Sequence, residues 1–530
     1  MYLLQPHVHS RRAFLKRAGQ LAFTGAALPT AINLAAMGEA AAFNAGNDYK
    51  ALVCVFMYGG SDYANTLIPA DAASYAAYQT IRGTTGSSLQ NGIALGRTAE
   101  TIGGANVPGI NSSLLTPLAG GAPISAIGQS GLQYAMHPSM TGLQGLFNAG
   151  QAAVMLNCGP LVVPISKAQY QGSNRTLFPV PPKLFSHNDQ QSIWQSSSPE
   201  GSTIGWGGNI GDLALNSNIS NGSNSLFTCV SITGNAVFLS GDTALSYQVG
   251  SGGAVKINAV GSPYSFGSVG TAINQLISPT GRANILEREY SIVNKRAVDA
   301  EGAITSAIAG FPTTTAPFSS FPGGYSLSDQ LRMVARLIAA RDTLKVKRQV
   351  FMVSIGGFDS HDNLLTDHVR NMGRVSGAMT AFHNAMTALG VADKVTAFTA
   401  TDFGRTLTSN GDGSDHGWGS HQFMVGGAVN GGKFYGYAPP VSVGGHASGD
   451  SAAIKAAPEN QWHVGQGRLL PTTSVDQYAG TLAKWFGVAN TELTGQGSVL
   501  PFLDNFAGRT LTVNGTSLTY ANDLGFMKAP

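Results

Sequence analysis

Four short, continuously apolar runs constrain the fold of this chain more than any other feature. They cover residues 52–57, 152–157, 349–355 and 394–399. Runs that are apolar on both faces are typical of parallel strands covered by helices on either side. Helical periodicity appears between and after them, over 326–341, 363–389 and 475–486. The alternation predicts an α/β fold with a mainly parallel central sheet and helices on both faces.

The middle of the chain has a different composition. Residues 213–270 are rich in Ser, Asn and Gly with short β-branched patches, which indicates an inserted β-rich cap or edge hairpins. A helix with a charged, solvated face is predicted next, over 283–308. We therefore expect one large domain over 43–530 with an inserted cap around 213–345.

The N-terminal residues resemble an export signal. Residues 10–16 read SRRAFLK, a twin-arginine motif, and a weakly apolar stretch follows that is too polar for a stable membrane span. An amphipathic first helix of the domain is the alternative. We predict a signal peptide over 1–42, export by the twin-arginine translocase to the periplasm or the medium, and no integral membrane segment in the mature form.

The charge balance narrows the classes of partner. The chain has 31 basic and 28 acidic residues, of which residues 1–42 contain four basic and one acidic, so the remainder holds 27 of each. Such a balance argues against nucleic acid or an anionic membrane as the main partner. The cysteines, at 54, 158 and 229, are too widely spaced to indicate a thiolate zinc site or a disulfide framework.

Acidic and imidazole side chains follow three of the predicted strands. Carboxylates and imidazoles are the groups that bind divalent cations in proteins, and the C-terminal ends of parallel strands are where open α/β sheets bind ligands. As single residues, such side chains are more often turn formers, helix caps or structural residues than metal ligands. We predict a divalent metal site, with zinc, manganese or calcium as the cation, whose ligands are Asp62, Asp359, His361, Asp402, His416 and, as a weaker candidate, His421.

Two further residues are catalytic candidates. Arg405 could neutralise an anionic ligand through a forked pair of hydrogen bonds, or form a structural ion pair with Asp402. Ser186, beside His187, offers a hydroxyl that a metal could activate, with Thr66 as a second hydroxyl. The alternative for Ser186 is a helix N-cap with Asp189 in the first turn.

An ordered set of motifs resembles the bacterial domain-of-unknown-function family fifteen-oh-one. The resemblance runs from about Ala51 to Phe506, and its motifs are GGSDYANTLIP at 59–69, MHP at 136–138, SH at 186–187, GGFDSH at 356–361, DFGRT at 402–406 and DHGWG at 415–419. That family is grouped with the alkaline-phosphatase-like and sulfatase-like superfamily, whose members use one or two metals and a Ser, Thr or formylglycine nucleophile on phosphate or sulfate esters. The resemblance implies an alkaline-phosphatase-like fold, the ligand order given above, and Ser186 at the place of the nucleophile.

The chain departs from better-known members of that superfamily. Their Asp-His pair is Asp402-Phe403 here, and no Cys-x-Pro-x-Arg segment surrounds the cysteines, which argues against a formylglycine sulfatase. We expect an exported, metal-dependent hydrolase that acts on a small anionic phosphate or sulfate ester. The alternative is a catalytically degenerate exported binding or assembly protein with an unknown exported partner.

Overall fold

The structure is a computed structural model. It describes residues 43, 48–83, 92–102, 105–118, 125–126, 131–220, 225–255, 267–277, 283–494 and 498–529. The predicted signal peptide, residues 1–42, lies outside the described residues, so its export role stays a prediction. Within the described ranges, every helix is too short or too polar to span a lipid bilayer.

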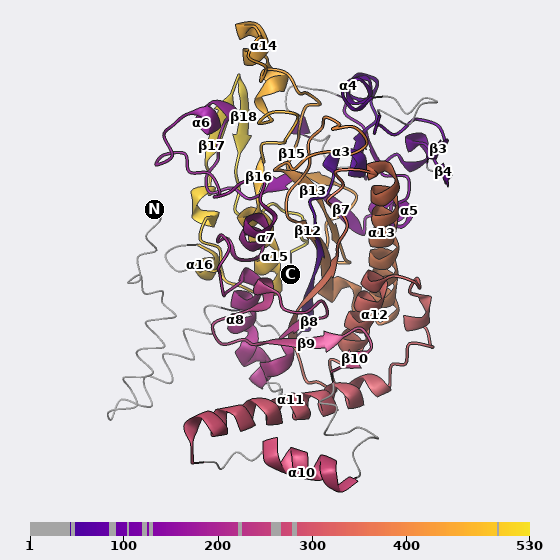
Figure 1. The fold of residues 1–530 in the computed structure, drawn as a ribbon, viewed down its shortest axis with the longest axis vertical. Coiled ribbons are helices and arrows are strands. Elements are labelled where there is room, and N and C mark those ends of the chain that lie inside the picture. Colours follow the sequence, from indigo (N-terminus) through magenta and orange to yellow (C-terminus); the bar gives the residue numbers. More distant parts are fainter. Residues whose placement is uncertain are drawn as a thin grey trace.

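A large, mostly parallel sheet forms the centre of the molecule and confirms the predicted α/β class (Figure 1). Its strand order is β10-β9-β8-β11-β1-β12-β13-β7-β14, with β16 also paired to β7. Among these, β13 is antiparallel to both of its neighbours and β10 is antiparallel to β9. The strands are β1 (Lys50–Met57), β7 (Ala152–Gly159), β8 (Cys229–Ser231), β9 (Ser246–Gly250), β10 (Gly253–Ala254), β11 (Arg348–Ile355), β12 (Val395–Thr401), β13 (Ser420–Val425), β14 (Phe434–Tyr435) and β16 (Thr473–Ser474).

Helices cover both faces of this sheet. On β1, Val53 and Val55 belong to one hydrophobic core, which also contains residues of α12 (Ser326–Ala339) and α13 (Leu364–Ala388). Leu52 and Cys54 belong to a second core, with residues of α8 (Trp206–Ser220) and α15 (Val475–Phe486). Successive residues of a strand point to opposite faces, so a strand apolar at every position must be buried on both sides.

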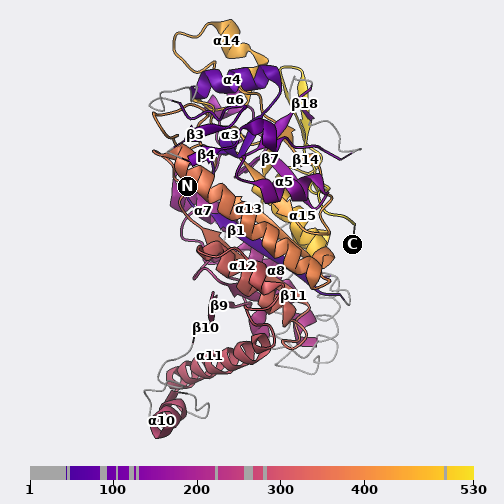
Figure 2. The ribbon, with the colours of Figure 1, turned by 90° about the vertical axis from the view of Figure 1, so that its right-hand side faces the viewer.

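The described part of 213–270 does not form a separate layer. Its strands β8, β9 and β10 continue the central sheet beside β11. Beyond them, α10 (Gly267–Ile277) and α11 (Ile285–Ala309) form a helical arm that extends away from the sheet (Figures 1 and 2). These strands therefore lie at the edge of the central sheet, which is closer to the predicted edge hairpins than to a separate β-rich cap. The predicted limits of the insertion, 213–345, stay a prediction.

The remaining elements surround the sheet. They are α3 (Tyr63–Thr66), β2 (Leu67–Pro69), α4 (Ala72–Arg82), β3 (Glu100–Ile102), β4 (Ala105–Val107), β5 (Ser125–Ala126), β6 (Tyr134–Met136), α5 (Thr141–Asn148), α6 (Lys167–Gln171), α7 (His187–Ser196), β15 (Tyr437–Ala438), α14 (Ala452–Ala456), α16 (Asn490–Leu493), β17 (Thr510–Val513) and β18 (Thr516–Thr519). All three cysteines are buried free thiols.

Candidate metal centre

Three neighbouring strands end together at one edge of the sheet. In the parallel register, Met57 at the end of β1 lies beside Ile355 of β11 and Thr401 of β12. The loops that follow the three strands therefore begin at the same level. This shared edge brings together segments that are some three hundred residues apart in the chain.

Two glycines allow these loops to approach closely. Gly59 has a φ of +117°, and a Cβ there would lie 2.3 Å from the backbone nitrogen of Asp359. A Cβ on Gly413 would lie 2.2 Å from backbone atoms of His361. Both distances are too short for any real Cβ contact. Glycine at these positions is what lets the loops after β1 and β12 pack against the loop after β11.

Three imidazoles and one carboxylate meet at this edge, and we call His187, Asp359, His361 and His416 the His–Asp cluster. Ligand atoms of His187, Asp359 and His416 all lie within 4.8 Å of one another. The Asp359 carboxylate lies 3.4 Å from Nε2 of His187 and 3.2 Å from Nε2 of His416. Nε2 of His361 lies 3.1 Å from the same carboxylate and 3.0 Å from Nε2 of His416.

Hydrogen bonds fix which nitrogen of two of these rings carries a proton. Nδ1 of His416 is 2.8 Å from the carbonyl oxygen of Phe185, and Nδ1 of His187 is 2.6 Å from Oδ2 of Asp402. Since both partners can only accept, each Nδ1 must donate, and each neutral ring presents an unprotonated Nε2 toward Asp359. Lone pairs and a carboxylate that converge in this way repel one another unless a cation or a proton lies between them.

The surroundings shift the pKa of two ring groups in opposite directions. The hydrogen bond to Asp402 raises the pKa of His187 above its ordinary value, against the effect of partial burial. Burial lowers the pKa of His416. His416 is therefore the imidazole that more readily stays neutral, whereas His187 retains a proton more readily.

Arg405 contacts the cluster from its buried side. Its guanidinium is fully buried, and Nη1 donates to Oδ1 of Asp359 at 2.8 Å and to the carbonyl oxygen of Gly59 at 3.0 Å. Partial burial raises the pKa of Asp359, but the hydrogen bond and charge of Arg405 outweigh it, so that pKa lies below its ordinary value. The ion pair considered for Arg405 with Asp402 is thus made with Asp359 instead, and Asp359 stays ionised.

Asp402 lies behind the cluster rather than in it. Its Oδ2 accepts hydrogen bonds from Nδ1 of His187, from Nε2 of Gln191 at 2.8 Å and from the backbone nitrogen of Gly59 at 3.2 Å. Its Oδ1 is buried and has no hydrogen-bond partner among the described residues. A carboxylate that orients a ligating histidine is the usual second partner of a metal-bound imidazole, and a buried orphan oxygen is stabilised by a nearby cation or water.

Besides Asp402, which contacts the cluster from outside, two predicted ligands are not brought to it at all, which corrects the sequence interpretation. Asp62 is buried, and both of its oxygens accept hydrogen bonds from Arg82, at 2.7 and 2.6 Å. His421 is also buried: its Nδ1 accepts from the backbone nitrogen of Asn157 at 3.1 Å, and burial lowers its pKa to about 3. Asp62 is therefore neutralised within the protein, and His421 serves the packing of β13 against β7.

The hydroxyl candidates are both engaged in other contacts. Ser186 is the N-cap residue of α7, and its Oγ donates to Oδ2 of Asp189 at 2.9 Å, in the first turn of that helix. Thr66 is buried, and its hydroxyl donates to the carbonyl oxygen of Asp62 at 2.7 Å. Ser186 therefore takes the N-cap position that the alternative predicted, with Asp189 in the first turn, although its side chain caps no backbone amide of the helix.

His187 is the cluster residue that sequence reasoning missed. It opens α7, and its ring packs against Phe403 with centroids 4.8 Å apart. In the Ser186-His187 pair it is the imidazole, and not the predicted hydroxyl, that reaches the strand ends. The available signal was the SH motif at 186–187, which places a histidine at the first position of α7.

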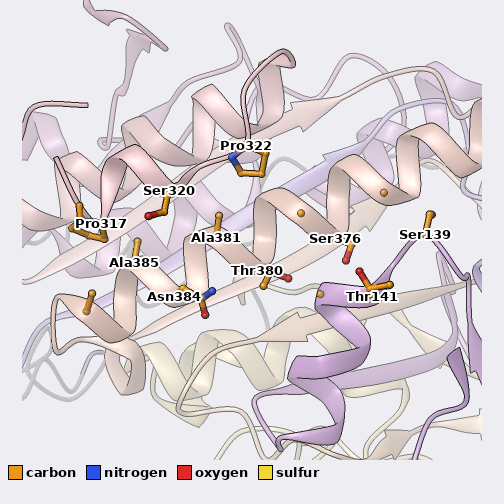
Figure 3. Close-up of a pocket in the computed structure, with 15 residues that line it drawn as sticks. Ser139, Thr141, Pro317, Ser320, Pro322, Ser376, Thr380, Ala381, Asn384 and Ala385 are labelled. Atoms are coloured by element: carbon orange, nitrogen blue, oxygen red, sulfur yellow. The ribbon is translucent and has the colours of Figure 1, made fainter. Parts of the chain in front are cut away.

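The cluster lies on an open surface. The side chains of Asp359 and His361 are 44% and 45% exposed, against 24% for His416. Two cavities formed by described residues lie elsewhere: a cleft of about 550 Å³ runs along α13 beside Ser376 and Thr380 (Figure 3), and one of about 650 Å³ flanks Ile193 of α7. Neither is lined by a residue of the His–Asp cluster. A small solute can therefore reach the cluster directly from solvent.

Comparison with solved structures gives only distant similarity. The crystal structure of Ps i-CgsB in complex with k-i-k-neocarrahexaose is 10% identical, with a TM-score of 0.32 over 88% of this chain and 79% of that chain. The lipoteichoic acid synthase LtaP from Listeria monocytogenes is 9% identical, with a TM-score of 0.26 over 75% of this chain and 68% of that chain. At these values neither carries an argument about function.

No curated protein matches the chain. A family model does, and the segment it matches contains Asp359, His361, Asp402, Arg405 and His416, whereas His187 lies outside it. Residues 297–453 match the family described as "Protein of unknown function (DUF1501)", which confirms the family resemblance over that part of the chain.

Proposed function

We propose that the chain is an exported, metal-dependent hydrolase of phosphate or sulfate esters with an alkaline-phosphatase-like fold. The observation that carries this proposal is the convergence of three imidazole Nε2 atoms on the carboxylate of Asp359. Imidazole and carboxylate together suit zinc or manganese better than calcium, which prefers an all-oxygen shell. A divalent cation bound there would polarise an ester oxygen and favour deprotonation of an attacking water molecule.

The residues around the cluster have orienting roles in this proposal. Asp402 holds the proton on Nδ1 of His187, and the Phe185 carbonyl does the same for His416, so that both rings present Nε2. Arg405 keeps Asp359 ionised and aimed at the rings. Because the Arg405 guanidinium is fully buried, it acts as a positioning residue, whereas the sequence alone suggested that it neutralises an anionic ligand.

We propose water rather than Ser186 as the nucleophile. The Ser186 hydroxyl would first have to release its hydrogen bond to Asp189. Water has direct access, because almost half of the Asp359 side chain is exposed. Ser186→Ala is then expected to retain at least about a third of the turnover, whereas loss of a covalent nucleophile lowers rates by orders of magnitude.

The test combines metal analysis with turnover. The mature chain is loaded with zinc or manganese and assayed with p-nitrophenyl phosphate, bis-p-nitrophenyl phosphate and p-nitrophenyl sulfate. His416→Gln is expected to lose the bound metal and the activity together. The control is His446→Gln, since His446 is also partly buried but lies outside the cluster and contacts the carbonyl oxygen of His463. Absence of bound metal in the parent chain would refute the proposal.

A binding or assembly protein is the second candidate, and the engaged hydroxyl of Ser186 favours it. Such a protein would bind the cation at the His–Asp cluster and turn over none of the three esters. Metal retained by the parent chain and lost in His416→Gln, with no turnover in either, would support this candidate against the hydrolase.

Export through the twin-arginine route is also a proposal. It is supported by the paired Arg11 and Arg12 ahead of an apolar stretch. Replacing both with lysine in the full-length chain is expected to leave the protein in the cytoplasm of a host that has this route. Unchanged secretion of the double variant would contradict it.

A further inference from the structure

The helix α11 carries an apolar seam that is buried at one end and exposed at the other. Its members recur at alternating spacings of four and three, at positions 286, 290, 293, 297, 300, 304 and 307. This is the heptad spacing of a helix that packs along its length against another helix. Ala300, Ile304 and Ala307 are at most 4% exposed, within the main core.

The N-terminal half of the same seam faces solvent. Leu286 is 77% exposed, Tyr290 62% and Val293 61%. The neighbouring helix α10 contacts α11 but leaves these three side chains uncovered. Large apolar side chains aligned on one helix face mark a surface that binds a partner, and the arm holds this face away from the sheet (Figure 2).

We propose that this face binds a second copy of the chain, with the two α11 helices antiparallel. Antiparallel pairing about a twofold axis between positions 291 and 292 sets Tyr290 opposite Val293 of the second copy and Leu286 opposite its Ala297. Glu289 and Arg296 each precede a seam residue and so flank the same side of the contact; in this register they lie two positions out of direct opposition, within reach of each other's long side chains, and symmetry repeats that pair. The charged residues beside the seam of one copy are thus complementary to the same residues of an identical second copy.

The position of the main body also favours this orientation. In the antiparallel register, the first residue of the second helix, Ile285, lies opposite Val298, just before Ala300, where α11 enters the core. The segment of α11 that precedes the core, residues 285–298, is therefore long enough for the antiparallel pairing. The two bodies lie at opposite ends of the paired helices, whereas parallel pairing would place both at the same end.

The contact is small, so the dimer is expected to be weak. Only four seam residues per copy take part, which corresponds to the lower end of specific interfaces, roughly 1,000 Å² in total, and to a dissociation constant on the order of micromolar. The inference does not depend on the proposed catalysis, because the arm contains no residue of the His–Asp cluster.

Sedimentation equilibrium of the mature chain between about 1 and 100 µM tests the inference. The parent is expected to be mainly monomer at the low end and mainly dimer at the high end, and Val293→Glu is expected to weaken association at least tenfold. Leu177→Glu is the matched control, since Leu177 is 65% exposed but lies far from the arm in sequence. Circular dichroism checks that both variants stay folded, as expected for exposed positions.

A charge reversal tests the register itself. Glu289→Arg and Arg296→Glu are each expected to weaken the dimer, and the double variant is expected to recover most of the loss. A parent chain that is monomeric throughout, or a dimer that is insensitive to Val293→Glu, would overturn the inference. So would a monomer that binds phosphatidylglycerol vesicles through Val293, because the face would then serve a lipid surface.

Discussion

Asp62→Asn distinguishes a structural role for this carboxylate from the metal-binding role that its motif suggests. The Asp62 and Arg82 side chains are 1% and 0% exposed and joined by two short hydrogen bonds. Removing one partner of a buried ion pair leaves the other charge uncompensated and destabilises a protein by about 3–5 kcal/mol. We therefore expect Asp62→Asn to lower the free energy of unfolding by that amount and to leave zinc affinity within about twofold of the parent.

Urea denaturation followed by tryptophan fluorescence measures the first quantity, and competition with a chromogenic chelator measures the second. Asp329→Asn is the matched control, because its pair with Arg332 is 2.6 Å long but has side chains that are 38% and 24% exposed. Ion pairs as exposed as this one contribute under about 1 kcal/mol to the free energy of unfolding. Combining Asp62→Asn with Arg82→Met should recover part of the loss, since no unpaired charge then stays buried. Unchanged stability with a tenfold loss of zinc affinity would refute this reasoning.

Other consequences of the structure can be tested in the same way. Gly59→Ala is expected to abolish metal binding in a folded chain, because its Cβ would meet the Asp359 backbone; retained stoichiometric zinc would contradict the close approach. Burial raises the pKa of Asp476 to about 6, so the folded state binds the extra proton between roughly pH 4 and 6, and this group's contribution falls by about 3 kcal/mol as the pH rises through that window. Asp476→Asn should flatten that part of a urea-derived stability profile, and an unchanged slope would exclude Asp476 as its source. His421→Gln is expected to keep full metal stoichiometry by elemental analysis, because the ring lies outside the cluster.

The sequence predicted the parts of the fold that depend on local pattern. The apolar runs became β1, β7, β11 and β12, and the periodic segments became α12, α13 and α15 within a few residues. The antiparallel β13 was missed because its residues follow a glycine-rich loop and include polar side chains such as His421 and Gln422. Burial of these polar groups depends on partners elsewhere in the fold, including Asn157 and Thr399.

The site was predictable where its residues follow strands, and less so elsewhere. Asp359, His361 and His416 come after β11 and β12, so the shared strand register was enough to bring them together. Asp62 follows β1 in the same way, but Arg82, twenty residues later, reaches back to it, and no sequence pattern shows that contact. His187 is the first residue of α7, and the position of this helix on the sheet depends on tertiary packing that no local sequence pattern shows.

The antiparallel placement of β13 affects the segment that carries Arg405 and His416. This segment leaves the sheet at the end of β12 and re-enters at the start of the adjacent β13, so both of its ends are anchored in the same rigid layer. A connection held at both ends, with a buried arginine inside it, loses little conformational freedom when a ligand arrives. His416 is thereby held in place by the fold, so a ligand that binds at this edge does not have to order the loop that carries it.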